Sequence, residues 1–525
     1  MTAPDLVVRG GTVIDGTGAP PFRADIAVAA GRIVDVGDLA DARDAAVLDA
    51  EGLAVAPGFI DIHSHSDFTL LVDPRAVSSI TQGVTLEVIG NCGYGCNPIG
   101  DPRLAREAIY GFREDLPLTW IDMAGYVERL ESARPAVNVA ALVPNGQLRL
   151  ATVGLEMRPA GPDELDAMKR LLRQGLEQGG FGYSTGLEYA TEAGAPETEV
   201  TELCRVCAEH GGLYATHTRN RDEGAVEAVA EAIRTAERAG ARLQISHITP
   251  RGGRADAERA MALVDAARAR GGDVAFDMHT RLFGTTYLKV ILPSWALRGG
   301  RDAIARRLSD PDERAKLKSH RSVISAFGDW DRVVLLDDPA FPELSRRSLG
   351  EIARERGGDA FDCAYDILLA EIDHLHRPMV IIHSYSEDLL KLTYEHPLCA
   401  IGSDATALAP DGPLAAATFH GAYTWASWFY RRMVRETGAL AAGDAVRRMT
   451  GLPAERLGLA DRGVIREGAC ADLAIFDADR FAEAGTTFEP NRVASGMVHV
   501  LVNGVVAMRD RALTGERGGA GLRRS

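Results

Sequence analysis

The sequence has no apolar run long enough to cross a membrane. No window approaches about 18 consecutive apolar residues, so we expect no membrane-spanning helix. The start of the chain has no basic segment followed by a long apolar one, and a secretory signal is not expected. The formal net charge of −16 and the lack of long basic runs argue against binding of nucleic acid.

Cysteine and lysine are scarce. The seven cysteines are an odd number scattered over 525 residues, which is typical of a reducing compartment, and we predict a cytoplasmic protein. The pair Cys204 and Cys207 lies in a helical pattern without a second pair, and we interpret it as packing. The five lysines are Lys169, Lys289, Lys316, Lys318 and Lys391, and none ends a predicted strand.

The two ends of the chain have the same pattern of short strands broken by turns. Residues 1–57 and 460–525 each lack an apolar face large enough to fold alone. We therefore predict one small β-sandwich domain assembled from both termini, flanking a large middle domain at 58–459.

The middle of the chain alternates strands with helical patterns. This alternation predicts an α/β protein, and the number of strands favours a (β/α)8 TIM-like barrel over a doubly wound sheet. Residues 299–358 are charged and helix-leaning, and we expect a helical insertion there. Nine candidates compete for eight places in the barrel, at 59–63, 84–89, 138–143, 180–184, 213–217, 242–247, 273–278, 379–383 and 398–402.

The segment Gly58–Asp67 ends an apolar strand with His63 and His65. In an extended strand, residues i and i+2 point to the same side, so both imidazoles can reach one point. Neutral imidazole is a common ligand of zinc and related metals. Two surface histidines in a loop are the alternative interpretation.

Other chemically capable side chains follow other predicted strands. In a barrel, the carboxyl ends of all strands open on one face, where active sites lie. We therefore expect these side chains to converge, although each alone would more often be packed and hydrogen-bonded than metal-ligating. The set is His63, His65, Cys92, His217, His247 and Asp404.

Several segments together resemble the amidohydrolase superfamily, and most closely its N-acyl-D-amino-acid deacylase (D-aminoacylase) branch. The resemblance extends over nearly the whole chain. It lies in the His-x-His-x-Asp segment after the first barrel strand, in Gly90-Asn91-Cys92-Gly93, Ser184–Tyr189, Thr216–Asn220, Ile245-Ser246-His247, Leu292–Ala296 and Gly402-Ser403-Asp404.

The resemblance implies a zinc centre without a lysine. Many amidohydrolases bridge two metals with a carbamylated lysine, and the branch places the cysteine of Gly-Asn-Cys-Gly in that role, here Cys92. It implies a tight zinc site at Cys92, His217 and His247, with His63 and His65 at a second, weaker or unoccupied site. Metal binding deprotonates a cysteine thiol outright.

The resemblance also makes Asp404 a metal ligand and the catalytic acid and base. A bound zinc ion lowers the pKa of its water toward neutrality and polarises the substrate carbonyl. Asp404 would take the proton from that water and deliver it to the leaving nitrogen. The alternative for Asp404 is a helix N-cap after a strand.

The match weakens in the substrate-binding segments. In the branch, a lysine, a tyrosine and an arginine hold the free carboxylate of the acyl-amino acid, and all three positions differ here. Arg251 or Arg281 could replace the lost cation, as could Arg219, because a guanidinium binds a carboxylate bidentately. Solvated loop arginines are an equally good interpretation. His279 and Tyr189 complete the substrate-binding candidates.

We therefore predict a zinc-dependent hydrolase of a non-peptide C–N bond, with an N-acyl-D-amino acid as the leading substrate. The first alternative is a hydrolase of cyclic amides such as a lactam, hydantoin or imide. The second alternative is a non-catalytic scaffold that kept the fold and lost the chemistry. The presence of all six site groups argues against it. The expected partner is a small-molecule amide substrate, and we expect binding neither to nucleic acid nor to a membrane. A homo-oligomer is possible.

Overall fold

The computed structural model describes residues 3–39, 45–113 and 115–524 and contains two compact units. The larger unit comprises Met1–Thr280, Asp388–Gly485 and Glu489–Ser525, and the smaller one Arg281–Glu387 with Thr486–Phe488. No helix among the described residues has both the length and the apolar character that a bilayer crossing needs.

Eight parallel strands form the barrel of the larger unit, which confirms the predicted fold. Their order in the sheet is β16-β12-β11-β10-β9-β8-β7-β6. All residues of most of these strands are buried, because a barrel strand packs on the interior and on the outer helices. The strands are β6 (Phe59–Asp61), β7 (Val84–Ile89), β8 (Asn138–Pro144), β9 (Gly182–Gly186), β10 (Leu213–His217), β11 (Arg242–Ile245), β12 (Val274–Met278) and β16 (Cys399–Ile401).

The barrel closes between the segments that follow β6 and β16. The backbone N–H of Asp404 donates to the carbonyl oxygen of His63 at 2.8 Å, and that of His65 donates to the carbonyl oxygen of Ala405 at 2.8 Å. The closing hydrogen bonds therefore involve residues predicted for the metal site.

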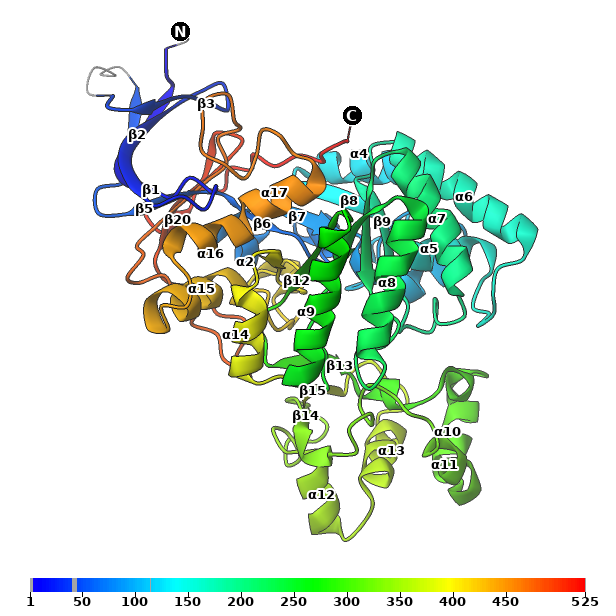
Figure 1. Cartoon of the computed structure of the whole chain (residues 1–525). Helices are drawn as coiled ribbons and strands as arrows, with labels where there is room; N and C mark the ends of the chain where they lie inside the picture. Colours follow the sequence, from blue (N-terminus) through cyan, green and yellow to red (C-terminus); the bar gives the residue numbers. More distant parts are fainter. Residues whose placement is uncertain (1–2, 40–44, 114, 525) are drawn as a thin grey trace. The chain divides into compact units, whose positions relative to one another are not determined.

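Four long helices alternate with the barrel strands, as the sequence pattern predicts, and α8 and α9 stand side by side in green in Figure 1. Each turns an apolar stripe inward. On α8 the stripe contains Val229, Ala232, Ile233 and Ala236. The four are α6 (Pro162–Glu177), α7 (Glu197–Glu209), α8 (Ala225–Ala239) and α9 (Arg254–Ala269).

Shorter helices complete the larger unit. They are α1 (Thr69–Val72), α2 (Val77–Ile80), α3 (Pro102–Ala105), α4 (Met123–Ala133), α5 (Asn145–Thr152), α15 (Trp425–Tyr430), α16 (Ala442–Met449) and α17 (Gly451–Leu457), while α14 (Glu387–Glu395) begins at the last residue of the main segment of the smaller unit.

Strands from both ends of the chain form one nine-stranded sheet, in which blue and red segments lie together in Figure 1. The N-terminal β5 pairs antiparallel with the C-terminal β17. A single buried cluster contains Leu6, Ile26, Ile475 and Leu501, from strands at both ends of the chain. The strands are β1 (Leu6–Val13), β2 (Phe22–Ala29), β3 (Arg32–Gly37), β4 (Ala46–Asp49), β5 (Ala54–Pro57), β17 (Leu473–Phe476), β18 (Met497–Val502), β19 (Val505–Arg509) and β20 (Ala512–Leu513).

The smaller unit has a three-stranded antiparallel sheet, β13 (Phe283–Tyr287), β15 (Met379–His383) and β14 (Val333–Leu335), in that order. Its helices are α10 (Arg301–Ser309), α11 (Pro311–Leu317), α12 (Leu349–Arg356) and α13 (Ala360–Ala370). The insertion expected at 299–358 lies inside this unit.

One strand candidate does not belong to the barrel. Residues 379–383 form β15, which pairs antiparallel with β13 and β14, whereas the candidate at 180–184 supplies barrel strand β9. A short apolar run has the same appearance in both kinds of sheet, because the strand period does not depend on its partners.

Candidate metal centre

His63 and His65 follow β6, and both rings are buried, with side chains 1% and 3% exposed. Their Nε2 atoms lie 3.6 Å and 3.3 Å from Oδ1 of Asp404, which follows β16. Gly402 allows this approach, since a Cβ there would lie 2.9 Å from the Cβ of His63. The two histidines and the aspartate form one group of potential metal ligands.

Cys92 and His247 form a second group with His63. The Cys92 sulfur lies 3.1 Å from Nε2 of His63 and 3.5 Å from Nε2 of His247. In each group, the potential ligand atoms lie within 4.8 Å of one another. We call His63, His65, Cys92, His247 and Asp404 together the candidate centre.

Three members of the candidate centre have left-handed backbones, with φ of 54° at Cys92, 37° at His247 and 45° at Asp404. Non-glycine residues rarely adopt positive φ, and such strain persists where the surrounding structure enforces it, often at functional sites. Next to Cys92, the backbone N–H of Gly93 donates to the hydroxyl of Ser184 at 3.2 Å, and this bond helps to hold the strained conformation. Each strained residue follows a barrel strand, so the strain helps turn its side chain inward.

His217 ends β10 and packs against His247 with ring centroids 4.6 Å apart. Its Nε2 lies 2.8 Å from a carboxylate oxygen of Glu188, and its Nδ1 lies 3.2 Å from the hydroxyl of Tyr189. His217 is therefore beside the candidate centre, while its ring nitrogens face two other side chains.

Burial keeps two histidines of this region neutral. It lowers the pKa of His217 to about 4, although Glu188 opposes this, and it lowers the pKa of His247 well below its usual value, with help from Arg221. Both imidazoles are therefore neutral at pH 7, the form that binds metals. At His63, burial is outweighed by Cys92 and Asp277, which raise its pKa.

The predicted substrate-binding residues lie in different surroundings. The side chain of Arg251 is 8% exposed, and its guanidinium faces Glu188 at 3.2 Å and Asp222 at 3.4 Å. His279 follows β12, with Nε2 4.0 Å from Asp404. Tyr189 contacts His217, and Arg281 is the first residue of the smaller unit.

Four partly exposed rings contact one another in a row that reaches the candidate centre at His65, and we call them the aromatic wall: Tyr94, Tyr110, Tyr189 and Phe419. Their ring centroids are 4.7 Å apart for Tyr94 and Tyr110, 5.0 Å for Tyr94 and Tyr189, and 6.0 Å for Tyr110 and Phe419. Tyr110 lies 4.8 Å from the ring of His65. The wall therefore offers an apolar surface next to the potential ligands.

Two residues of the site were not predicted. Asp277 lies 3.1 Å from Nδ1 of His63, and Glu188 contacts His217. The sequence did contain signals, because Asp277 precedes His279 by two residues on a predicted strand, and Glu188 lies in the Ser184–Tyr189 motif.

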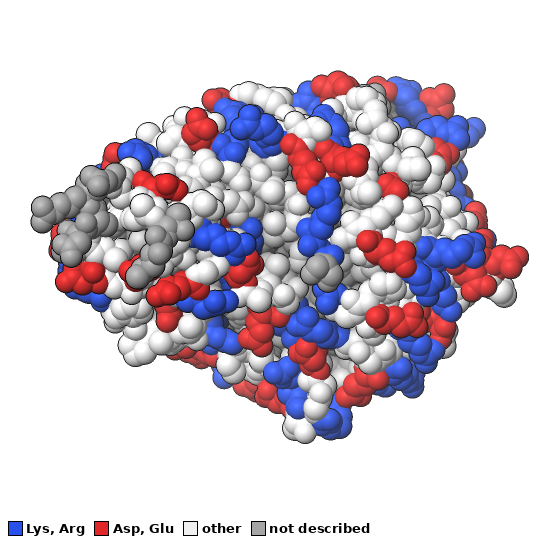
Figure 2. All heavy atoms as spheres, turned by 90° about the horizontal axis from the view of Figure 1, so that it is seen from above, with Lys and Arg blue, Asp and Glu red and all other residues white. Residues whose placement is uncertain are grey.

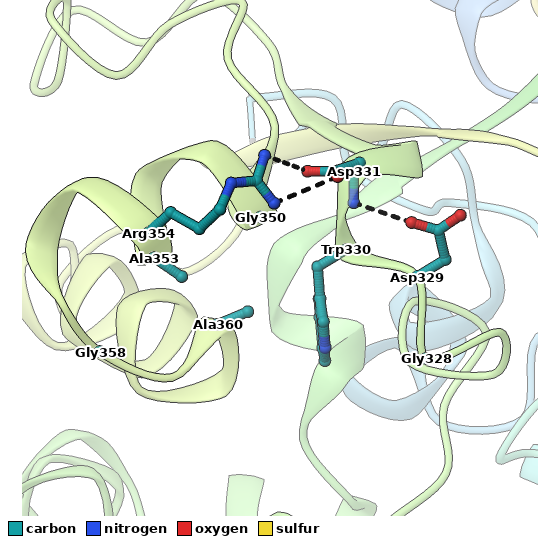
Figure 3. A pocket seen from close by; sticks show the side chains of 9 residues that line it. All are labelled: Gly328, Asp329, Trp330, Asp331, Gly350, Ala353, Arg354, Gly358 and Ala360. Carbon is teal, nitrogen blue, oxygen red and sulfur yellow. Dashed lines mark hydrogen bonds and ion pairs between the residues drawn. The ribbon is translucent and has the colours of Figure 1, made fainter.

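Two further features of the surface concern a hollow and the distribution of charge. A hollow of about 350 Å³ in the smaller unit is lined by Trp330 and by an ion pair of Asp331 with Arg354 at 2.8 Å (Figure 3). None of the predicted site residues is among those that line it. On the face seen in Figure 2, basic and acidic residues are interspersed.

Comparison with known proteins places these features in context. The amidohydrolase family model matches residues 46–508. The chain is 34% identical to N-acyl-D-glutamate deacylase of Alcaligenes xylosoxydans xylosoxydans, over 99% of this chain and 96% of that one. It is 32% identical to D-aminoacylase of the same organism, over 99% and 98%. The crystal structure of N-acyl-D-glutamate deacylase from Bordetella bronchiseptica, complexed with zinc and a phosphonate mimic of the tetrahedral intermediate, superposes with a TM-score of 0.81 at 32% identity, covering 99% of this chain and 100% of that one.

Proposed function

Because this chain belongs to the amidohydrolase family, we propose that it is a metal-dependent deacylase that hydrolyses N-acyl-D-amino acids. One observation carries the proposal: potential metal ligands from separate barrel strands converge with Asp404 at one end of the barrel. The substrate class follows from the similarity to N-acyl-D-glutamate deacylase and D-aminoacylase.

The side chains of the candidate centre suit zinc. Cysteine and histidine are its usual ligands, at about 2.0–2.3 Å, and ligands of one tetrahedral ion lie roughly 3.5 Å apart. The Cys92 sulfur lies 3.1 Å from Nε2 of His63 and 3.5 Å from Nε2 of His247, which is close to this ligand spacing. The buried Nδ1 of His247 has no hydrogen-bond partner among the described residues and can carry the ring proton, which leaves the lone pair of Nε2, the atom that faces Cys92, for an ion.

We assign a tight zinc site to Cys92 and His247 with His63, and a weaker site to His63, His65 and Asp404. His217, which the family resemblance placed in the tight site, would have to exchange its contact with Glu188 or Tyr189 to join it. Zinc in such a site acts as a Lewis acid that polarises a carbonyl and acidifies water.

The chain's own residues would move the proton. The Asp404 carboxylate is partly exposed, with 22% of its side chain accessible, and lies 3.3 Å from His65 and 4.0 Å from His279. It would accept a proton from the attacking water and return it to the leaving nitrogen. The backbone bond from Asp404 to His63 fixes the carboxylate relative to the potential ligands.

Substrate selection would involve Arg251, His279 and Tyr189 of the larger unit, whereas Arg281 begins the smaller unit and stays a prediction from the sequence. Arg251 already faces Glu188 and Asp222, so a substrate carboxylate would have to compete with both. His279 is nearer the reacting group, through its contact with Asp404. The aromatic wall would hold an apolar part of the substrate.

A substrate panel tests the proposal. The zinc-loaded protein is incubated with N-acetyl-D-amino acids, including D-glutamate, D-aspartate and D-methionine derivatives, with their L-enantiomers, and with hydantoin, dihydrouracil and phthalimide. Release of free D-amino acids is the expected result. Turnover of cyclic amides alone would replace the proposal by the cyclic-amide alternative, and no turnover with no bound zinc would favour a scaffold.

Three further assignments accompany this proposal. All seven cysteines are free and buried, which agrees with the cytoplasmic location that we propose. We keep a terminal β-domain at 1–57 and 460–525 and a barrel domain at 58–459 as the proposed division. A homo-oligomer remains to be tested by sedimentation.

A further inference from the structure

Asp277 is a buried carboxylate, 2% exposed, on strand β12. Its Oδ1 lies 3.1 Å from Nδ1 of His63 and accepts a 2.8 Å hydrogen bond from the backbone N–H of His247. Its Oδ2 accepts a 3.1 Å bond from the side-chain amide of Gln244. One carboxylate therefore touches two potential ligands that come from different strands.

We propose that Asp277 is a positioning residue of the metal centre, which sets the tautomer of His63 and the place of His247. The inference rests on the proposed metal site, because it concerns how that site is held. It does not depend on the substrate.

The contact with His63 fixes which ring nitrogen faces the ligands. A carboxylate 3.1 Å from Nδ1 requires a proton on Nδ1. A ring that binds metal must be neutral, and its lone pair is then on Nε2, the atom that lies 3.1 Å from the Cys92 sulfur. Carboxylates that hold a histidine in this way orient the ring and raise its basicity toward a metal.

The contact with His247 holds a strained turn. His247 has a φ of 37°, and Asp277 binds this turn twice, through its carboxylate to the N–H of His247 and through its backbone carbonyl to the N–H of Ile248 at 3.1 Å. Because a left-handed residue persists only where neighbours enforce it, loss of the carboxylate would release the turn.

The charge of Asp277 needs compensation. Among the described ion pairs, its partner is His63, and its other contacts are neutral N–H groups. A buried carboxylate is costly unless it is paired. A cation bound to a neutral His63 would supply the positive charge that the ring proton otherwise gives, so Asp277 would contribute to metal affinity by charge as well as by geometry.

Two substitutions separate charge from geometry. Asp277→Asn removes the charge but keeps an oxygen that can accept from Nδ1–H of His63 and from the backbone N–H of His247. Asp277→Ala removes the charge and the acceptor. Asp472→Asn is the control, because Asp472 is a buried carboxylate immediately before β17 that accepts a bond from the backbone N–H of Asn503 at 2.7 Å and, like Asp277, has a cationic partner, here Arg462. All variants are the full chain.

Zinc affinity is measured by competition with a chromophoric chelator, and the cobalt-loaded proteins are compared by absorption in the d–d and thiolate charge-transfer region. We expect zinc affinity to fall about 10- to 100-fold in Asp277→Ala and less in Asp277→Asn, with altered cobalt bands. Asp472→Asn should keep the affinity and the spectrum of the unchanged protein.

The outcomes separate this inference from the proposed function. If the unchanged protein binds no zinc, both fail. If it binds zinc and the folded Asp277→Asn protein matches it in affinity and cobalt spectrum, Asp277 does not position the centre, although the deacylase proposal stands. If Asp277→Ala does not fold, Asp277→Asn decides alone, because it preserves the shape of the side chain.

Discussion

The backbone N–H of Asp404 donates a 2.8 Å hydrogen bond to the carbonyl oxygen of His63. This bond joins the segment after the last barrel strand to the segment after the first. The contact that closes the barrel is therefore also the one that sets the proposed proton carrier against a potential metal ligand, so fold closure and site geometry depend on each other.

The first prediction concerns Asp404. Replacement by asparagine keeps the size of the side chain and removes its capacity to accept a proton. We expect kcat to fall by about 10²- to 10⁴-fold, while the tight zinc site, held by other residues, retains its metal. Steady-state kinetics and metal analysis of the same preparation test this, and turnover equal to that of the unchanged protein would remove Asp404 from the mechanism.

The second prediction concerns metal removal. A ligand that binds only the folded state stabilises it by mass action. Dialysis against a chelator should therefore abolish turnover and lower the midpoint of thermal unfolding, and added zinc should restore both. Cys92→Ser, which removes the thiolate, should weaken zinc binding and reduce the stabilising effect of zinc. An unfolding midpoint that is the same with and without zinc would contradict the proposed site.

The third prediction concerns the close approach at Gly402. In Gly402→Ala the new Cβ would lie 2.9 Å from the Cβ of His63. We expect a loss of about 1–3 kcal/mol in the free energy of unfolding, measured by urea denaturation, together with weaker zinc binding. Gly37→Ala is the control, because a Cβ there meets nothing within 4 Å. Equal stability in the two variants would show that β16 can retreat from His63 without cost.

The fourth prediction concerns the aromatic wall. Tyr110→Ala removes the ring nearest to His65, with centroids 4.8 Å apart. An aromatic contact contributes about 0.5–1.5 kcal/mol, so kcat/KM for substrates with a bulky apolar acyl group or side chain should fall roughly 2- to 10-fold. N-acetylglycine should be affected less. Ile121→Ala, at a residue 71% exposed, controls for surface effects, and an equal loss for both substrates would argue against selection by the wall.

The fifth prediction concerns the pH dependence of stability at Glu192. Burial raises the pKa of this carboxyl from 4.5 to about 7. Between these values the folded state binds the proton more tightly than the unfolded state, so the contribution of Glu192 to stability falls as the pH rises from about 4.5 to 7. The change amounts to about 3 kcal/mol at most.

Glu192→Gln tests this prediction, since glutamine can accept the bonds from Asn145 and Gly186 without a charge. Urea denaturation at a series of pH values should show a smaller loss of stability from pH 5 to pH 7 in the variant. Parallel curves for the variant and the unchanged protein would mean that Glu192 does not titrate in this range.

Local patterns predicted much of the fold. The alternation of strands with helical patterns predicted the barrel and the presence of helices between its strands. The assignment of β15 needed tertiary information, because an apolar strand of five residues has no feature that names its partner. The sequence of β9, Gly182–Gly186, is rich in small and polar residues and carries a weaker strand pattern than its neighbours in the barrel.

The sequence by itself determined the kinds of side chain at the strand ends, and through them the family. Which of these side chains meet was decided only by tertiary structure. His63 lies beside Cys92 and Asp277, and His217 beside Glu188, through contacts between residues from 29 to 214 positions apart. The period of a strand fixes the side to which a residue points, but barrel closure and the strained turns fix the distances, and metal chemistry depends on those distances.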